Sequence, residues 1–164
     1  MIPHLLLVSA VGFFLAADAP RDDAAKKEMK KLQGTWVMVS GEMEGEKLSE
    51  EQVKKIPKFV LVFVDESVSL KKYARGEDAP PQVLFKGTFK LDPSQKPKTI
   101  DIKILEDINE NLNKGKTVPG IYELDGATLR WCAPEPGSKA DRPKAFSTKP
   151  GTKHMLSVLK REKR

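Results

Sequence analysis

The chain has little of the residues from which metal centres, disulfides and nucleophilic active sites are built. Its 164 residues include one cysteine, Cys132, and two histidines, His4 and His154. A single cysteine cannot form an intramolecular disulfide, and these histidines are too few for a His-rich zinc site. Walker and Rossmann glycine loops and a Gly-x-Ser-x-Gly nucleophile elbow are also absent from the sequence. We therefore predict no metal, no cofactor and no enzymatic activity.

Aromatic residues are scarce as well, at 7% of the chain, and no arginine-rich block is interleaved with them. Single-stranded nucleic acids are bound by stacking side chains along a cationic groove, so the composition argues against a nucleic-acid partner. The net charge is nevertheless +6, from 29 Lys and Arg against 23 Asp and Glu. These cations are scattered, which is typical of a soluble surface. Weak attraction to an anionic polymer is the partner preference that this charge indicates.

No apolar run is long enough for a membrane-spanning helix, which needs about 20 residues. Residues 5–17, LLLVSAVGFFLAA, are uncharged and are followed by Ala17-Asp18-Ala19 and a charged stretch, as in a secretory signal peptide. We predict a signal peptide over residues 1–19 and a single exported domain over residues 20–164, in the periplasm or outside the cell. Cleavage after Ala16 or Ala17 is the alternative, because cleavage after Ala19 would leave a proline first.

The body of the chain consists of short apolar segments separated by turns. In Thr99–Leu105 isoleucines alternate with charged residues at a period of two, as in a strand with one buried face. Asp125-Gly126 is the strongest hairpin signal, and Gly87 predicts a bulge or bend within its strand. Strands are expected near residues 36–40, 59–64, 68–73, 83–91, 99–105, 120–124, 128–132 and 155–161.

Two short helices interrupt this strand pattern. Asp22 or Asp23 caps a predicted helix that runs to Leu32, and a capping-box pattern at Ser49 predicts a second helix over residues 50–56. Short strands, hairpin connections and little helix together predict an all-β fold, with one antiparallel sheet of about eight strands and one or two short helices. Such a sheet forms a sandwich or closes into a barrel, and closure removes its exposed edges.

Gly34-Thr35-Trp36, which follows a short helix and opens the first strand, resembles the Gly-x-Trp signature of lipocalins. In that family the tryptophan closes one end of the barrel, and a basic residue near the end of the last strand packs across it. The resemblance implies a lipocalin-like barrel with Gly34, Trp36 and Arg161 as its structural signature. Arg161 is preferred to Lys160 because guanidinium stacks better on an indole. An ordinary core tryptophan is the alternative for Trp36.

The chain is also similar to a family of exported planctomycete proteins that carry a lipocalin-like domain and have no established activity. The similarity runs from about residue 30 to residue 162, nearly the whole predicted mature chain. Its matching stretches are Leu32–Trp36, Gly87–Asp92, Lys98–Asp101, Gly120–Leu124, Arg142-Pro143 with Phe146, and Leu159–Arg161. This resemblance implies a fold and transfers no catalytic residue.

Two functions are compatible with these observations. The first is binding of a small apolar ligand, since an eight-stranded barrel either holds one ligand or is filled by its own side chains. The residues predicted to line such an interior are Phe85, Phe89, Ile100, Ile102, Tyr122 and Trp131. The second is an interaction or structural module that contacts an envelope protein through surface loops and needs no ligand. The long loop Pro134–Pro150, with Arg142 and Lys144, is its candidate surface.

Overall fold

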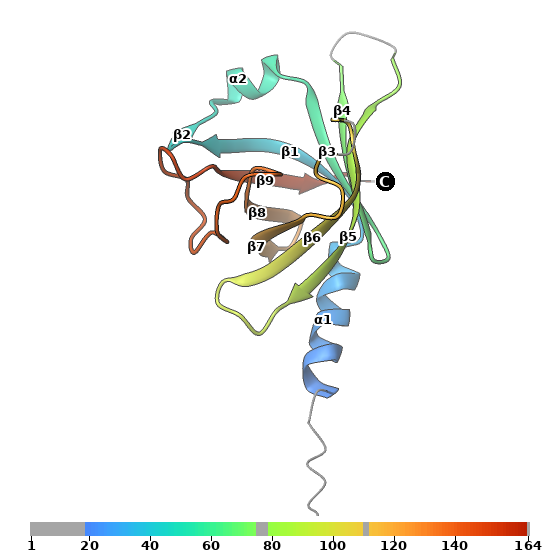
Figure 1. Ribbon diagram of the computed structural model, residues 1–164. Helices are drawn as coiled ribbons and strands as arrows, with labels where there is room; N and C mark the ends of the chain where they lie inside the picture. The colour runs from blue at the N-terminus through green and yellow to red at the C-terminus, as the bar shows by residue number, and fades with distance from the viewer. Residues whose placement is uncertain (1–18, 75–78, 110–111, 164) are drawn as a thin grey trace, which may run out of the picture.

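The computed structural model describes residues 19–74, 79–109 and 112–163, which form a closed antiparallel β-barrel with two short helices (Figure 1). The predicted all-β barrel of about eight strands is thereby confirmed. The predicted signal peptide lies outside the described residues, apart from Ala19. Among the described residues, no helix has both the length and the apolar character that a membrane span requires.

The elements follow the sequence pattern closely. The predicted helices are α1 (Ala19–Leu32) and α2 (Glu50–Lys55). The strands are β1 (Gly34–Met43), β2 (Glu46–Lys47), β3 (Lys58–Val64), β4 (Ser67–Tyr73), β5 (Gln82–Asp92), β6 (Lys98–Asp107), β7 (Thr117–Asp125), β8 (Thr128–Pro134) and β9 (His154–Arg161). The two-residue strand β2 was not predicted. It pairs with the end of β1 across the Glu44-Gly45 turn, whose residues both have positive φ.

The strands pair in the order β2-β1-β3-β4-β5-β6-β7-β8-β9, and β1 also pairs with β9. This last pairing joins the two ends of the row, so the eight longer strands form a ring. The predicted Asp125-Gly126 hairpin joins β7 and β8, with Gly126 at a φ of 54°. Figure 1 shows α1 and α2 at opposite ends of the barrel, which we call the α1 end and the α2 end.

The wall is weakest between β1 and β3. The two strands share four register pairs, from Gly34–Phe63 to Val37–Val60. Beyond Val37, β1 stays paired with β9 and has a bulge between Met38 and Ser40, while no register pair joins it to Lys58 of β3. We call this unpaired stretch of wall the seam. Along its other edge, β1 has no described strand partner between Met38 and Gly41, and β2 then pairs with Glu42 and Met43.

Helix α2 lies beside the seam, and hydrogen bonds between neighbouring residues cap its two ends. The Ser49 Oγ accepts a hydrogen bond from the Gln52 backbone N–H at 3.2 Å, and the Gln52 Oε1 accepts one from the Ser49 N–H at 2.7 Å. This capping box satisfies two backbone donors that a helix leaves unpaired at its start. A six-residue helix is too short to be stable alone, so its place depends on these bonds and on packing against β1.

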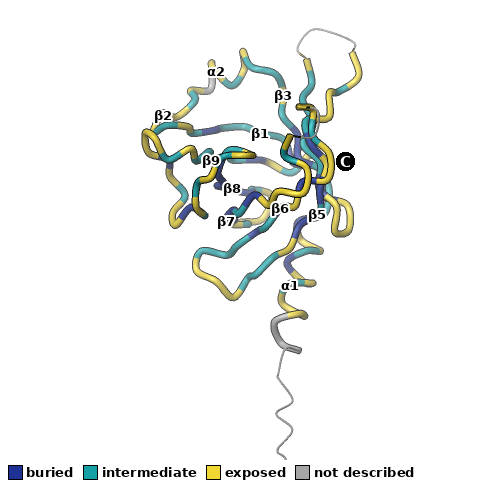
Figure 2. The backbone as a smooth tube through the Cα atoms, viewed as in Figure 1, coloured by how far each residue is buried: buried dark blue, intermediate teal, exposed yellow. Residues whose placement is uncertain are grey.

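The barrel interior is filled by apolar side chains at the α1 end. The largest buried ones include Trp36, Tyr122, Phe63 and Leu61, and Phe63 meets Phe89 edge-to-face with ring centroids 5.0 Å apart. Figure 2 shows buried residues along the strands and exposed residues in the connecting loops and along much of α1. Such packing is typical of a core in which side chains leave few voids.

The outer face of β3 is covered only in part. The sequence is apolar on both faces here, which predicts a second cover outside the barrel. Val60 is 2% exposed and Val62 is half-buried, but Val64 is 58% exposed. The expected outer cover is thus present over Val60 and partial over Val62, and it is missing at Val64.

We predict that Gly87→Ala destabilises the fold by about 1–3 kcal/mol, because overpacking forces the backbone to move. The predicted bulge is present between Lys86 and Gly87, and a Cβ at Gly87 would overlap the carbonyl oxygen of Lys103. Urea unfolding followed by circular dichroism measures the change. Lys90→Ala, at an exposed position of the same strand, is the control and should cost much less. Equal stability of Gly87→Ala and the wild type would contradict this interpretation.

Candidate functional site

Trp36 and Arg161 together close the α1 end. Trp36 is fully buried, and its Nε1 donates to the Leu32 carbonyl oxygen at 2.7 Å. The Arg161 guanidinium lies 4.1 Å from the centroid of the Trp36 ring, and it donates to the carbonyl oxygens of Gln33 and Lys31. The Arg161 side chain thus stacks on the buried Trp36 ring and also provides hydrogen-bond donors for carbonyl groups at the end of α1.

Gly34 explains the first position of the Gly-x-Trp motif. Its φ is +112°, a conformation that residues with a Cβ rarely adopt. A Cβ there would also lie 3.2 Å from the Nη1 of Arg161, which crosses this point on its way to Trp36. Gly34, Trp36 and Arg161 therefore form one packing unit, and their role in this structure is to stabilise the fold.

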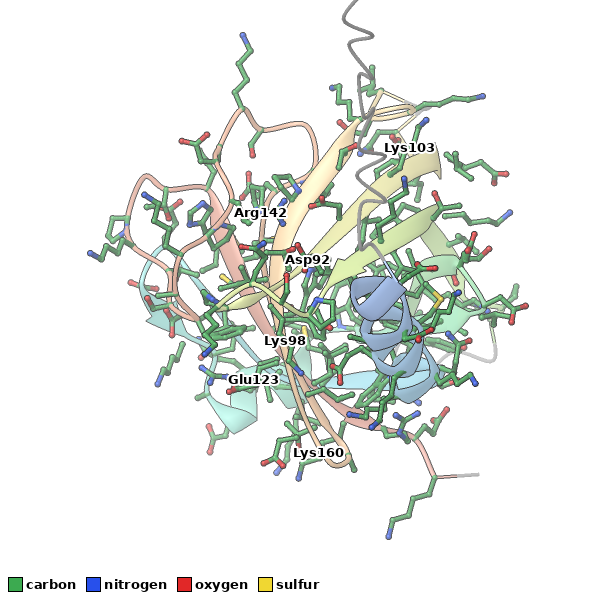
Figure 3. All side chains as sticks on the ribbon, turned by 90° about the horizontal axis from the view of Figure 1, so that it is seen from below. Asp92, Lys98, Lys103, Glu123, Arg142 and Lys160 are labelled. Carbon is green, nitrogen blue, oxygen red and sulfur yellow. The ribbon has the colours of Figure 1, made fainter. Side chains whose placement is uncertain are left out.

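A buried carboxylate fastens α1 to the barrel beside this unit. Glu28 is 7% exposed, and it accepts hydrogen bonds from Lys31 at 2.8 Å, from Lys98 at 2.9 Å and from the Tyr122 hydroxyl at 3.3 Å. Figure 3 views this end from below, with Lys98 beside α1. Lys98 also lies 5.9 Å from the centroid of the Tyr122 ring.

The charges of this cluster shift two pKa values in opposite directions. Burial raises the pKa of Glu28, but the hydrogen bonds and charges of Lys31 and Lys98 outweigh that effect and hold it below 4.5, its usual value. Burial, followed by the negative charge of Glu28, raises the pKa of Tyr122 well above its usual range. Glu28 is therefore ionised and Tyr122 protonated at neutral pH, as the hydrogen bond between them requires. We call Glu28 and its partners Lys31, Lys98 and Tyr122 the Glu28 latch.

The six residues predicted to contact a ligand all face the interior, but most of them are sealed in its core. Phe85 is 6% exposed, and the other buried members are at most 2% exposed: Phe89, Ile100, Ile102 and Tyr122. Trp131 is half-buried and packs over Gly120, where a Cβ would lie 2.7 Å from the indole nitrogen. None of the six lines either of two half-open pockets that the described residues form. Ligand contact by these residues stays a prediction.

The larger of these pockets lies at the seam. It is half-open, has a volume of about 390 Å³, and we call it the seam pocket. Its walls come from β1, from α2 and the residues after it, and from the neighbouring ends of β3 and β4. The lining residues are Val37, Met38, Val53, Pro57, Lys58, Tyr73 and Ala74. Lys58 is the one charged residue among these described lining residues.

The seam pocket reaches from the outer face of the wall to an interior side chain. Trp36 and Leu61 belong to the interior cluster, so strand alternation places Val37 and Lys58 on the outer face. Tyr73 is the register partner of Lys58 and shares that face. Met38, in contrast, packs against the interior cluster. The missing β1–β3 pairing thus leaves a half-open pocket in the side of the barrel.

Sequence reasoning missed the seam pocket, although one signal pointed toward it. The apolar outer face of Phe59–Val64 predicted a cover from outside the barrel, and α2 was predicted in the connection just before it. What the sequence did not reveal is that β1 leaves β3 after Val37. Strand register decides that separation, and no residue pattern in β1 marks it.

A second apolar cluster lies outside the barrel under the long loop 135–153, which we call the strap. Ile121, Cys132 and Leu156 are buried together, and Phe146 of the strap packs against them. Burial, together with the charge of Glu42, raises the pKa of the Cys132 thiol to about 11. Cys132 is thus a buried free thiol, as its place in an apolar strand predicts, and this burial argues against nucleophilic use.

Hydrogen bonds hold the strap against the wall. Arg142 donates to the Gly120 carbonyl oxygen and to the Asp101 carboxylate, both at 2.7 Å. The Glu42 Oε1 accepts from the backbone N–H of Thr148 at 2.6 Å and from its hydroxyl at 3.0 Å. Arg142 is therefore engaged inside the molecule, whereas Lys144 is exposed. The partner contact proposed for this loop stays a prediction.

The described residues hold no cluster of three or more His, Cys, Asp and Glu side chains that could bind a metal ion. His154 opens β9 at the surface, and its Nε2 lies 2.9 Å from the Asp141 carbonyl oxygen. No protein-family model matches this chain, and no curated protein sequence matches it. Function must therefore be argued from the geometry of the chain itself.

We predict that Glu28→Gln flattens the acid limb of the stability curve. The pKa of Glu28 is lower in the folded protein than in the unfolded chain, so its contribution is complete above pH 4.5 and is lost as the pH falls through the folded pKa. At neutral pH the variant should lose about 1–3 kcal/mol. Urea unfolding at a series of pH values measures both effects. The exposed Glu51→Gln is the control, and equal acid slopes in Glu28→Gln and the wild type would refute the latch.

We predict that Arg142→Ala exposes Cys132 to alkylation by iodoacetamide. Loss of the two Arg142 hydrogen bonds weakens the strap by roughly 1.4 kcal/mol or more, and this corresponds to about tenfold faster reaction through local opening. Mass spectrometry of timed samples gives the rate. Lys144→Ala changes an exposed residue of the same strap and should react like the wild type. An unchanged rate in Arg142→Ala would show that the strap is held elsewhere.

Proposed function

We propose that the protein binds a small apolar ligand, and that the seam pocket is its binding site. The observation that carries this proposal is a half-open pocket of about 390 Å³, whose lining side chains are apolar apart from the Lys58 ammonium group and the Tyr73 hydroxyl. Ligand sites are typically concave, about 300–1,000 Å³ in volume and mostly apolar, with few polar groups. The seam pocket has these properties, and it opens where the wall lacks strand pairing.

The neighbouring structure supports entry at this point. Of the α2 residues 51–55, Val53 is half-buried, whereas Glu51, Gln52, Lys54 and Lys55 are exposed. Segments with few buried apolar contacts open at low free-energy cost. The α1 end is instead filled by core side chains and closed by Arg161. We therefore place ligand binding at the seam rather than at the closed α1 end.

The setting that we propose for this binding follows from the sequence. The apolar leader supports export to the periplasm or the extracellular space, where a carrier for a poorly soluble molecule is useful. The barrel with its Gly34, Trp36 and Arg161 unit supports kinship with the exported lipocalin-like proteins. In this proposal the ligand meets the side of the wall, so the filled interior and a binding function are compatible.

The test is a fluorescence titration with N-phenylnaphthylamine, a neutral apolar probe that brightens on leaving water. The wild type should bind it, and Val53→Gln should bind it roughly tenfold more weakly, because a polar amide then lines the seam pocket. Lys54→Gln alters the adjacent exposed residue of α2 and should leave affinity unchanged.

Urea unfolding of the three proteins verifies that they fold equally well. Absence of binding to the wild type, or equal affinity of Val53→Gln and the wild type, would reject the seam pocket as the site. Organic extraction of protein purified from its native host gives an independent result. An apolar compound recovered in molar amounts supports the proposal, and none recovered counts against it.

A further inference from the structure

Lys58 gives the seam pocket a single charged group. Its Nζ lies 5.5 Å from the centroid of the Tyr73 ring, and both residues line the pocket. Its ionic partner is the Glu162 Oε1, at 3.1 Å. Glu162 follows the end of β9 and is not a lining residue. The cation therefore belongs to the pocket, while its present counter-ion lies outside it.

Another anion can readily replace the Glu162 carboxylate as the ionic partner of Lys58. The two side chains are 43% and 48% exposed, and ion pairs at such positions contribute little to stability. An anion that enters the seam pocket can take the place of the Glu162 carboxylate without leaving a buried charge unpaired. Tyr73 can keep its contact with the ammonium group during this exchange, because the ring approaches from within the pocket.

From this arrangement we propose that Lys58 recognises an acidic group, so that the seam pocket selects apolar molecules that carry a carboxylate, sulfonate or phosphate. This inference rests on the proposed function and adds the chemical class of the ligand. The apolar walls hold the body of the molecule, and the charge-assisted hydrogen bond to Lys58 fixes its orientation. A neutral analogue uses the same walls but leaves Lys58 with Glu162, and a cationic analogue is repelled.

Two probes that share one aromatic skeleton separate the two proposals. Anilinonaphthalene sulfonate carries an acidic group, whereas N-phenylnaphthylamine carries none. The wild type should bind the sulfonate roughly tenfold more tightly than the neutral probe. Added sodium chloride should reduce this preference, because salt screens an exposed charge pair. The affinity of the neutral probe should change little with salt.

Variants of the ion pair make the test specific. Lys58→Met should lose the preference for the sulfonate over the neutral probe, whereas Lys58→Arg should retain the preference. Glu162→Gln removes the competing carboxylate and should tighten sulfonate binding. Lys54→Met removes an exposed cation of α2 that does not line the seam pocket and should behave like the wild type.

The results of these titrations distinguish failure of the proposed function from failure of the role proposed for Lys58. If the wild type binds neither probe, the proposed function fails and the inference fails with it. If the neutral probe binds but the sulfonate shows no preference, or if Lys58→Met keeps that preference, only the role of Lys58 is overturned. Loss of preference in Lys54→Met would show that the sulfonate responds to surface charge in general, and this would also overturn the inference.

Discussion

Strand β1 is paired with β9 along one edge, but its other edge is paired with β3 over only part of its length. It pairs with β9 from Trp36 to Met43 but with β3 over four register pairs only. The first pairing closes the sheet into a ring, and the early loss of the second leaves the seam. Both the closure of the ring and the seam pocket therefore depend on the pairing of β1. A barrel with full β1–β3 pairing would have no such opening in this wall.

The two ends of the barrel consequently have different physical characters. At the α1 end, the core side chains, the Arg161–Trp36 stack and the Glu28 latch leave few degrees of freedom. At the α2 end, a six-residue helix lies beside unpaired backbone. Sites that admit ligands are drawn from the less stable parts of a structure, while the rigid parts hold them in place. This division of roles favours the α2 end as the functional end.

Local chemistry made most of the fold predictable. The isoleucine alternation in β6, the Asp125-Gly126 turn, the capping box at Ser49 and the bulge at Gly87 each follow from a few adjacent residues. The candidate site was not predictable in the same way. Apolar character predicts which residues face the interior, but it cannot separate a ligand contact from a core contact. Val37, Lys58 and Tyr73 meet only because of strand register, which depends on the whole sheet.

The pairing of β1 with β9 also determines when this protein can acquire its structure. Trp36 and Arg161 are register partners although they stand near opposite ends of the polypeptide. Contacts so distant in sequence carry a large loop-closure cost and slow the folding of β-rich domains. The ring cannot form until β9 has been synthesised, because β9 is the strand that pairs with β1 to close it. Until then, the polypeptide lacks both its closed ring and the contact between Arg161 and the Trp36 ring.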